Sequence, residues 1–192
     1  MFSWDAGGDM MLRSERLMLR TPGRSDLGPL HDAIMESLEE LVRWLPWARP
    51  SHRRADSRQY LRHARIARSQ RSAFEFLILD GETEELYGMA SLHRIDWLRR
   101  SAGLGYWIRK TAWGTGVATE AAEALLTHAF QVLELYRVEA HVAIDNKSSQ
   151  RVIDKLGFTR EGVARGVEVI NGRYMDHIQY SLLRTDTGER PR

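Results

Sequence analysis

The feature that most constrains the fold of this chain is a loop with two glycines, which joins a predicted strand to a long predicted helix. It lies within the segment Tyr106-Trp107-Ile108-Arg109-Lys110-Thr111-Ala112-Trp113-Gly114-Thr115-Gly116-Val117-Ala118-Thr119-Glu120-Ala121. The first N–H groups of a helix lack intrahelical partners and lie at the positive end of its dipole, so this loop predicts an anion site. A diphosphate would fit there, because Gly114 and Gly116 place no side chain between it and the backbone.

The loop alone is equally compatible with a tight turn that binds nothing, and two common phosphate motifs do not match it. A P-loop requires a glycine directly before Lys-Thr, but Arg109 precedes Lys110-Thr111 here. A dinucleotide fingerprint would use Thr119 as its third small position and would open a doubly wound parallel domain. A predicted antiparallel meander precedes the loop instead, although Asp145 imitates the acidic residue of that fingerprint.

The remaining pattern predicts a single domain of the α+β class over residues 1–192. A strand and two helices are followed by a meander of three strands, the long helix, a strand, a short helix and a hairpin. The hairpin turn is Asn171-Gly172, which suits type I′. These elements cover 17–20, 27–41, 51–71, 74–79, 86–95, 102–108, 117–130, 137–144, 146–156, 167–170 and 173–183. The ends, 1–10 and 185–192, are expected to fray.

The composition excludes several kinds of site. With no cysteine, the chain has no disulfide, thiolate zinc site, iron–sulfur cluster or cysteine nucleophile. No two of its seven histidines have the helical i,i+4 spacing of a zinc pair, so no metal is expected. No apolar run is long enough to span a bilayer, and the first eleven residues lack the basic start of a signal peptide. We therefore expect a cytoplasmic protein.

One segment is strongly basic. Residues 51–71 carry seven arginines and a single acidic residue, Asp56. Such an excess of charge would suit RNA, a phosphate or an acidic partner. A solvated helix face is the simpler interpretation of the same residues.

Three further stretches accompany the glycine loop. They are Ser14 to Arg20 (S-E-R-L-x-L-R), Asn146-x-x-Ser149-x-x-Val152-x-x-Lys155-Leu156-Gly157-Phe158 and Ile170-Asn171-Gly172-x-Tyr174-x-Asp176-His177. Read together with the loop, these stretches resemble the GNAT N-acetyltransferase superfamily, and more narrowly its RimJ/RimL branch, which acetylates protein N-termini and other amines. The likeness covers about residues 12–184, with Trp113 and Lys110 as departures from the common pattern in the loop.

The resemblance implies a fold and a cofactor. The fold is a central, mostly antiparallel twisted sheet of about seven strands flanked by helices. The strand 105–108 should separate from the strand 138–143, so that acetyl-CoA pairs with its free edge and an N–H near Trp107 or Ile108 points at the thioester carbonyl. The implied cofactor-binding residues are Tyr106, Trp107, Ile108, Trp113, Gly114, Thr115, Gly116, Val117, Ala118, Thr119, Asn146 and Ser149.

The resemblance also implies two catalytic residues. Glu168 matches a proposed catalytic glutamate and would take the proton of the amine, although an ordinary exposed strand residue explains it equally well. Ser149 would supply a proton or a hydrogen bond to the departing thiolate, or else simply satisfy groups at the helix end. Asn146 is expected to cap the helix and to contact the cofactor.

Four other residues are weaker candidates. Trp44 and Trp47 lie where this branch builds the wall of its acceptor site, but aromatic residues at this spacing are more often core. His93 and His141 lie in predicted strands and could pass a proton through water, yet a packed or solvated histidine is the simpler interpretation.

The leading hypothesis is therefore an enzyme that moves the acetyl group of acetyl-CoA to a primary amine by direct attack in a ternary complex. The amine would belong to a protein N-terminus or to a small molecule. The main alternative is a non-catalytic module that binds RNA or the ribosome through residues 51–71, and a third is a dinucleotide enzyme. Neither a membrane nor a nucleic acid is required for the leading hypothesis, and a homodimer stays open.

Overall fold

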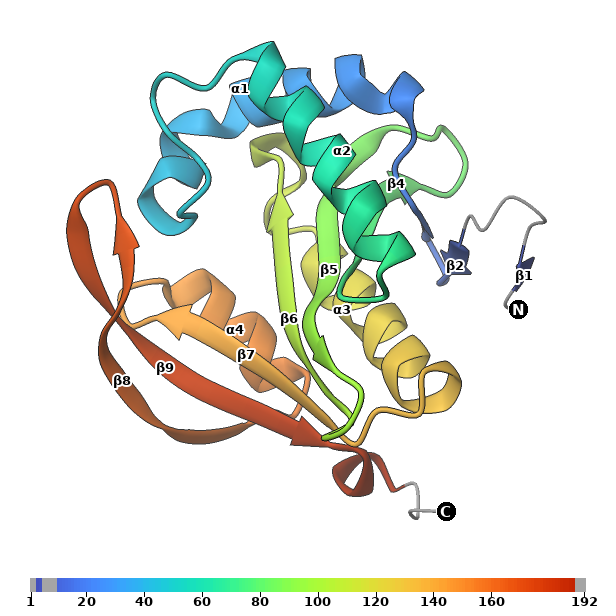
Figure 1. The fold of residues 1–192 in the computed structure, drawn as a ribbon, viewed down its shortest axis with the longest axis vertical. Coiled ribbons are helices and arrows are strands. Elements are labelled where there is room, and N and C mark those ends of the chain that lie inside the picture. Colours follow the sequence, from blue (N-terminus) through green and yellow to red (C-terminus); the bar gives the residue numbers. More distant parts are fainter. Residues whose placement is uncertain (1–2, 5–9, 189–192) are drawn as a thin grey trace.

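The structure is a computed structural model, which describes residues 3–4 and 10–188. Its strands form one sheet in the order β1-β2-β3-β4-β5-β6-β7-β9-β8 (Figure 1). The strands are β1 (Ser3–Trp4), β2 (Met10–Arg13), β3 (Leu17–Arg20), β4 (Phe74–Asp80), β5 (Leu86–Asp96), β6 (Ser101–Ile108), β7 (Arg137–Ala143), β8 (Thr159–Ile170) and β9 (Arg173–Leu183). The helices are α1 (Leu27–Trp44), α2 (Arg54–Ser69), α3 (Val117–Thr127) and α4 (Lys147–Lys155). All pairs are antiparallel except β6 with β7, so the predicted mixed, mostly antiparallel architecture is confirmed.

The structure adds to the prediction at both ends and in one strand. Two short strands, β1 and β2, precede the seven that were expected. The strand β8 begins at Thr159 rather than at 167. The sequence did not predict this earlier start, because the first half of the strand is a half-exposed edge with little apolar alternation. Most residues of the ends expected to fray lie outside the described residues. In the described parts of these ends, β1 pairs with β2, and Arg184–Thr187 forms a short 3₁₀ turn.

Both faces of the sheet are covered, as the alternation along β4 demonstrates. Phe76 and Ile78 are buried in a cluster with apolar residues of α3, whereas Leu77 and Leu79 are buried with those of α1 and α2. A strand at the centre of two apolar layers reads as a continuous hydrophobic run, as β4 does. None of the described helices combines the length and the apolar character that crossing a membrane requires.

The sheet opens at its centre. The strand β6 pairs with β7 only through Ser101–Gly103, against Arg137–Glu139. From Leu104 to Ile108 the same strand pairs with β5 alone. The predicted separation of these two strands is confirmed, and it leaves one edge of β6 without a neighbouring strand.

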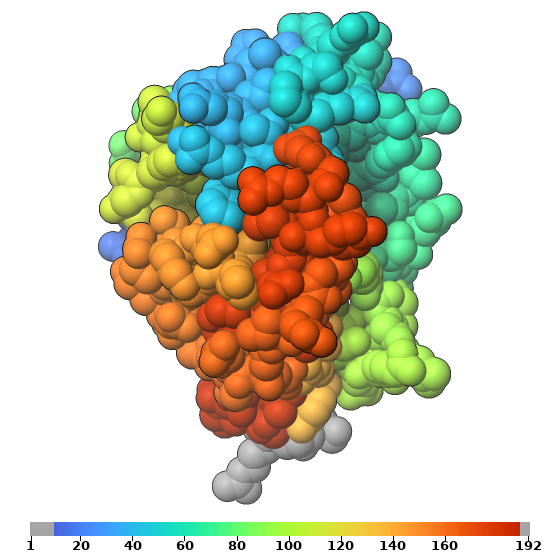
Figure 2. All heavy atoms as spheres, turned by 90° about the vertical axis from the view of Figure 1, so that its left-hand side faces the viewer, coloured from blue at the N-terminus to red at the C-terminus, as the bar shows by residue number. Residues whose placement is uncertain are grey.

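The β8–β9 hairpin reaches back across the molecule to α1 (Figure 2). Its tip residues, Asn171 and Gly172, have φ values of 50° and 77°, which confirms the left-handed turn predicted from their identity. The Asn171 side chain donates a hydrogen bond from Nδ2 to the Val42 carbonyl at 2.6 Å. This contact joins the end of the sheet to the C-terminal part of α1.

Candidate active site

A cavity of about 530 Å³ lies where α1, β6, the glycine loop and α4 meet. Every residue predicted to bind the cofactor lines it except Thr115, whose hydroxyl donates to the Ala112 carbonyl at 2.7 Å. The cavity therefore brings together two segments, 106–119 and 145–155, that the sequence analysis linked only by resemblance. Its lining is Glu40, Leu41, Trp44, Leu45, Tyr106, Trp107, Ile108, Ala112, Trp113, Gly114, Gly116, Val117, Ala118, Thr119, Asp145, Asn146, Lys147, Ser148, Ser149, Arg151, Val152 and Lys155.

The glycine loop presents free backbone donors to this cavity. Gly114 and Gly116 have φ values of 76° and 87°, in a region that other residues rarely adopt, so the turn itself requires glycine. Gly116 is the N-cap of α3. Among the described residues, none accepts a hydrogen bond from the N–H groups of residues 116–119. This is the arrangement in which a helix N-terminus binds a phosphate.

Trp113 closes the loop onto the end of β6. Its indole Nε1 donates to the Ile108 carbonyl at 2.8 Å, while about half of the side chain, 46%, stays exposed. The contact fixes the distance between the glycine turn and the strand edge, which a bound cofactor would have to span.

The free edge of β6 carries its own donors. The Arg109 N–H donates to the Tyr87 carbonyl of β5 at 2.7 Å, and backbone groups alternate in direction along a strand. The N–H of Trp107 therefore points to β5, and those of Tyr106 and Ile108 point to the open side. Of the two residues named for the thioester contact, the register leaves Ile108 as the available donor.

Ser149 and Tyr106 form a contact inside the cavity that the sequence did not predict. The two hydroxyl oxygens lie 2.9 Å apart, and Asn146 Oδ1 accepts from the Ser149 N–H at 3.1 Å. Asn146 is thus a helix cap, and the Ser149 hydroxyl is not used for capping. Burial raises the pKa of Tyr106 to about 12, although the Ser149 contact lowers it, so this hydroxyl keeps its proton at neutral pH.

Three cations on α4 were missed by the sequence analysis. Lys147, Arg151 and Lys155 line the cavity and follow one another at the i,i+4 spacing of a single helix face. That spacing was the signal that could have found them. Opposite the free N–H groups of α3, they add positive charge where phosphates would lie.

The two candidate tryptophans have different surroundings. Trp44 lines the cavity at the end of α1. Trp47 is not part of the lining. Its ring centroid lies 6.3 Å from that of Trp107 and 6.1 Å from that of Tyr60, within an aromatic cluster behind the cavity wall.

Glu168 lies outside the cavity lining. It pairs with Met175 across the hairpin, and it faces opposite to Val167 and Val169, which are 49% and 47% exposed. Burial lowers the pKa of the nearby His177 imidazole, and the half-buried Glu168 carboxylate opposes this shift only in part. The Nε2 atom of His177 is buried and has no hydrogen-bond partner.

His93 and His141 are both half-buried on the sheet. Burial, with smaller effects from Arg94 and His141, lowers the pKa of His93 to about 4, so this imidazole is neutral at pH 7. Its ring lies over β6, where a Cβ at Gly103 would come within 2.4 Å of it. Burial also lowers the pKa of His141.

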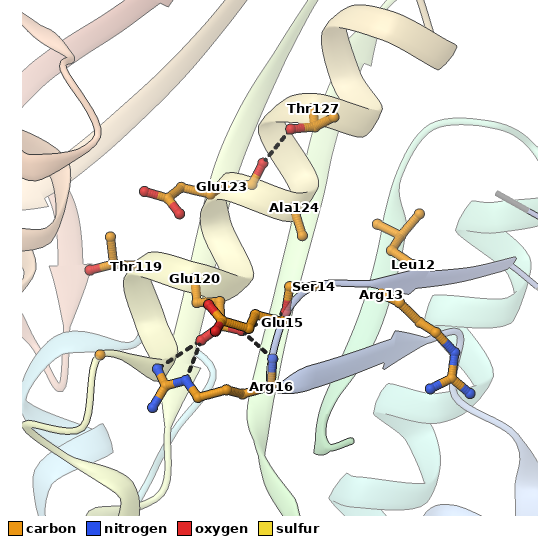
Figure 3. Close-up of a pocket in the computed structure, with 11 residues that line it drawn as sticks. Leu12, Arg13, Ser14, Glu15, Arg16, Thr119, Glu120, Glu123, Ala124 and Thr127 are labelled. Carbon is orange, nitrogen blue, oxygen red and sulfur yellow. Dashed lines mark hydrogen bonds and ion pairs between the residues drawn. The ribbon is translucent and has the colours of Figure 1, made fainter. Parts of the chain in front are cut away.

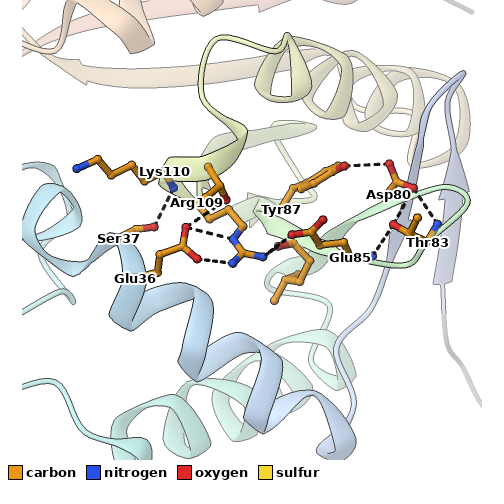
Figure 4. A network of polar contacts seen from close by, with 10 residues as sticks. Glu36, Ser37, Asp80, Thr83, Glu85, Tyr87, Arg109 and Lys110 are labelled. Carbon is orange, nitrogen blue, oxygen red and sulfur yellow. Dashed lines mark hydrogen bonds and ion pairs between the residues drawn. The ribbon is translucent and has the colours of Figure 1, made fainter.

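A polar network holds α1 against the beginning of the loop (Figure 4). The Arg109 guanidinium pairs with Glu36 of α1 and donates to Glu85 at 2.9 Å, and the Arg109 contact lowers the pKa of Glu36. The Lys110 N–H donates to Ser37 Oγ at 3.0 Å. These contacts fix the helix that carries one wall of the cavity. Within residues 3–4 and 10–188, no three metal-ligating side chains come together.

Comparison with known proteins agrees with this geometry. A family model described as an acetyltransferase (GNAT) domain matches residues 16–159. The chain is 34% identical to "Putative ribosomal N-acetyltransferase YdaF" of Bacillus subtilis (strain 168), over 90% of this chain and 94% of that protein. It is 29% identical to the ribosomal-protein-serine acetyltransferase of Escherichia coli (strain K12), over 88% and 94%.

A solved structure gives the same result for the fold and the cofactor. RimL, a ribosomal L7/L12 α-N-protein acetyltransferase in complex with coenzyme A, superimposes with a TM-score of 0.85 at 25% identity, over 90% of this chain and 97% of that chain. The glycine loop, the open strand edge and the matched family model lead to one assignment: this chain belongs to the GNAT acetyltransferase family and is an acyltransferase that uses acetyl-CoA.

Proposed function

We propose that this chain acetylates a primary amine, with the N-terminal α-amine of a protein as the first acceptor to test and a small amine as the second. The observation that carries the proposal is the cavity, which places the free N–H groups of α3, the open edge of β6 and the Ser149–Tyr106 pair around one space. The relatives named as ribosomal-protein acetyltransferases support a protein acceptor. The non-catalytic RNA-binding alternative is not favoured, because a formed cofactor cavity has no role in it.

The proposed reaction is a direct transfer. The neutral amine attacks the thioester carbon, the new C–N bond forms and the C–S bond breaks. The Ile108 N–H on the open edge is our donor to the carbonyl oxygen as it becomes negative. The amine proton passes to Glu168. The departing sulfur takes a proton from Ser149, which draws one from the Tyr106 hydroxyl. Solvent then returns a proton to Tyr106 and removes the one held by Glu168, so that the enzyme ends the cycle unchanged.

The test is a panel of acceptors with acetyl-CoA and purified protein. N-terminal peptides, the same peptides with blocked N-termini, polyamines and amino sugars would be incubated in parallel, and mass spectrometry would detect the addition of one acetyl group. The proposal expects acetylated free peptides and unmodified blocked ones. A protein that binds coenzyme A but releases none from acetyl-CoA in the presence of any of these amines would contradict the proposal.

Glu168→Gln tests the proposed base. We expect kcat/KM to fall by about tenfold to a hundredfold, most strongly at low pH, where more of the amine arrives protonated and needs a base. Affinity for coenzyme A should stay nearly unchanged, since Glu168 lies outside the cavity lining. A pH–rate profile and calorimetry measure the two quantities. Unchanged activity across the pH range would remove Glu168 from the mechanism.

We also infer that residues 1–192 act as one catalytic domain in the cytoplasm, where ribosomal-protein acceptors of the kind named for the relatives occur. A homodimer is a further state to test. Light scattering of the protein as it elutes from a size-exclusion column distinguishes monomer from dimer. Specific activity measured across a dilution series shows whether the active form dissociates at low protein concentration.

A further inference from the structure

A second hollow lies on the outer side of the glycine loop, between residues 12–16 and α3, and Figure 3 shows Arg16 and Glu120 paired within it. Arg16 directly precedes β3, and both of its terminal nitrogens donate to the Thr115 carbonyl at 3.2 Å. Its Nε donates to Glu120 of α3 at 2.8 Å, and the ion pair between the two side chains is 2.7 Å long. One guanidinium thus joins the loop to the first turn of the helix that the loop begins.

Glu120 is itself held in place. Its Oε1 accepts from the Ser14 hydroxyl at 2.7 Å and from the Arg16 N–H at 2.8 Å. Burial alone would raise the pKa of Glu120, but the hydrogen bonds from Arg16 and Ser14 hold it below its ordinary value. The carboxylate is therefore charged at neutral pH and is only 15% exposed, so it fixes the position of the guanidinium.

The direction of the Thr115 carbonyl determines the direction of the next donor. In a planar trans peptide the C=O and the following N–H point to opposite sides. With the Thr115 oxygen directed to Arg16, the Gly116 N–H points away from Arg16. Gly116 lies between two spaces, because it lines both the cavity and the outer hollow that contains Arg16. An N–H that points away from Arg16 therefore points toward the cavity.

We propose that Arg16, held by Glu120, is a positioning residue that turns the Gly116 N–H into the cavity and so sets the affinity for the diphosphate of coenzyme A. The inference rests on the proposed function for its ligand. It assigns a role to two residues that do not touch the acetyl group, and it explains why the loop needs a partner on its outer side.

A simpler role for Arg16 would be long-range attraction of a phosphate by its charge, and Glu120→Gln separates the two roles by the sign of the effect. Removal of a negative charge near the diphosphate would strengthen binding if charge alone mattered. If orientation matters, the amide weakens binding, because its NH₂ cannot accept from Arg16 or Ser14. Glu123→Gln is the matched control, since Glu123 is exposed one turn further along α3 and borders the same hollow.

The experiment measures the dissociation constant of coenzyme A by calorimetry, and steady-state kinetics with acetyl-CoA and with S-acetylpantetheine, which lacks the diphosphate. For Arg16→Gln we expect the dissociation constant of coenzyme A to rise about tenfold and the KM for acetyl-CoA to rise with it. A tenfold change corresponds to the loss of one charge-assisted hydrogen bond. The kcat, and turnover of S-acetylpantetheine, should change by less than about twofold. Glu120→Gln should weaken binding in the same direction, and Glu123→Gln should not weaken it.

Arg16→Lys keeps the charge but cannot hold the carbonyl and the carboxylate together, so it should recover only part of the affinity. Thermal unfolding without ligand identifies any variant that fails to fold, in which case Arg16→Lys carries the comparison. Full affinity in Arg16→Lys, or tighter binding in Glu120→Gln, would overturn the inference. A wild-type protein that binds no coenzyme A would instead overturn the proposed function, and this inference with it.

Discussion

Gly88→Ala is expected to destabilise the protein by about 3–5 kcal/mol, the largest effect on stability that we predict for a single methyl group. Gly88 lies in β5 opposite Ile108 and has a φ of 154°. A Cβ there would lie 2.1 Å from the Trp107 carbonyl oxygen and 2.9 Å from the Ile108 Cα. Both are backbone atoms of β6, so the clash can be relieved only by separating the two strands.

The measurement is urea unfolding of the variant beside wild-type protein and Gly162→Ala. Gly162 also lies in a strand, but a Cβ there meets nothing within 4 Å and its φ is ordinary, so the control should change the unfolding free energy by about 0.5 kcal/mol or less. Any folded Gly88→Ala protein should also bind coenzyme A more weakly, because the displaced strand is the one with the open edge. A destabilisation no larger than that of the control would show that β6 moves freely.

The parts of the fold that the sequence predicted are those with local signals. The turn Asn171-Gly172 and the cap Asn146 were readable because each residue satisfies a backbone requirement on its own. The early start of β8 was not predictable in this way, because residues such as Thr159 and Arg160 carry no strand pattern and are held by pairing with β9. Strand order across the sheet has no local signal either, and the separation of β6 from β7 was expected only through the family resemblance.

The same distinction applies to the site. The glycine loop could be identified because the residues that form its anion site are consecutive in the sequence. The Tyr106–Ser149 contact joins positions 43 residues apart, and the Arg16–Glu120 pair joins positions 104 residues apart. No spacing rule connects such residues, since the fold alone brings them together.

Ser149→Ala is expected to lower kcat by about a hundredfold, at the upper end of the effects on activity that we predict for one side chain. The hydroxyl is half-buried and bonded to Tyr106, and Asn146 rather than Ser149 caps the helix, so its loss should not unfold α4. Without a proton at this position the departing sulfur must leave as a free thiolate. Ser149→Thr retains the hydroxyl and should keep most of the activity. Calorimetry with coenzyme A should show nearly unchanged binding in both variants.

Tyr106→Phe and the double variant Tyr106→Phe/Ser149→Ala determine whether the two hydroxyls act as one unit. The phenylalanine leaves the β6 backbone, and with it the Ile108 donor, in place. If Tyr106 restores the proton of Ser149, removing it from the Ser149→Ala protein should cost almost nothing further, because groups that act in series are not additive. Rates for the four proteins under saturating acetyl-CoA complete the cycle. Independent losses that multiply in the double variant would separate Tyr106 from the proton route and leave it as a residue that only packs beside the serine.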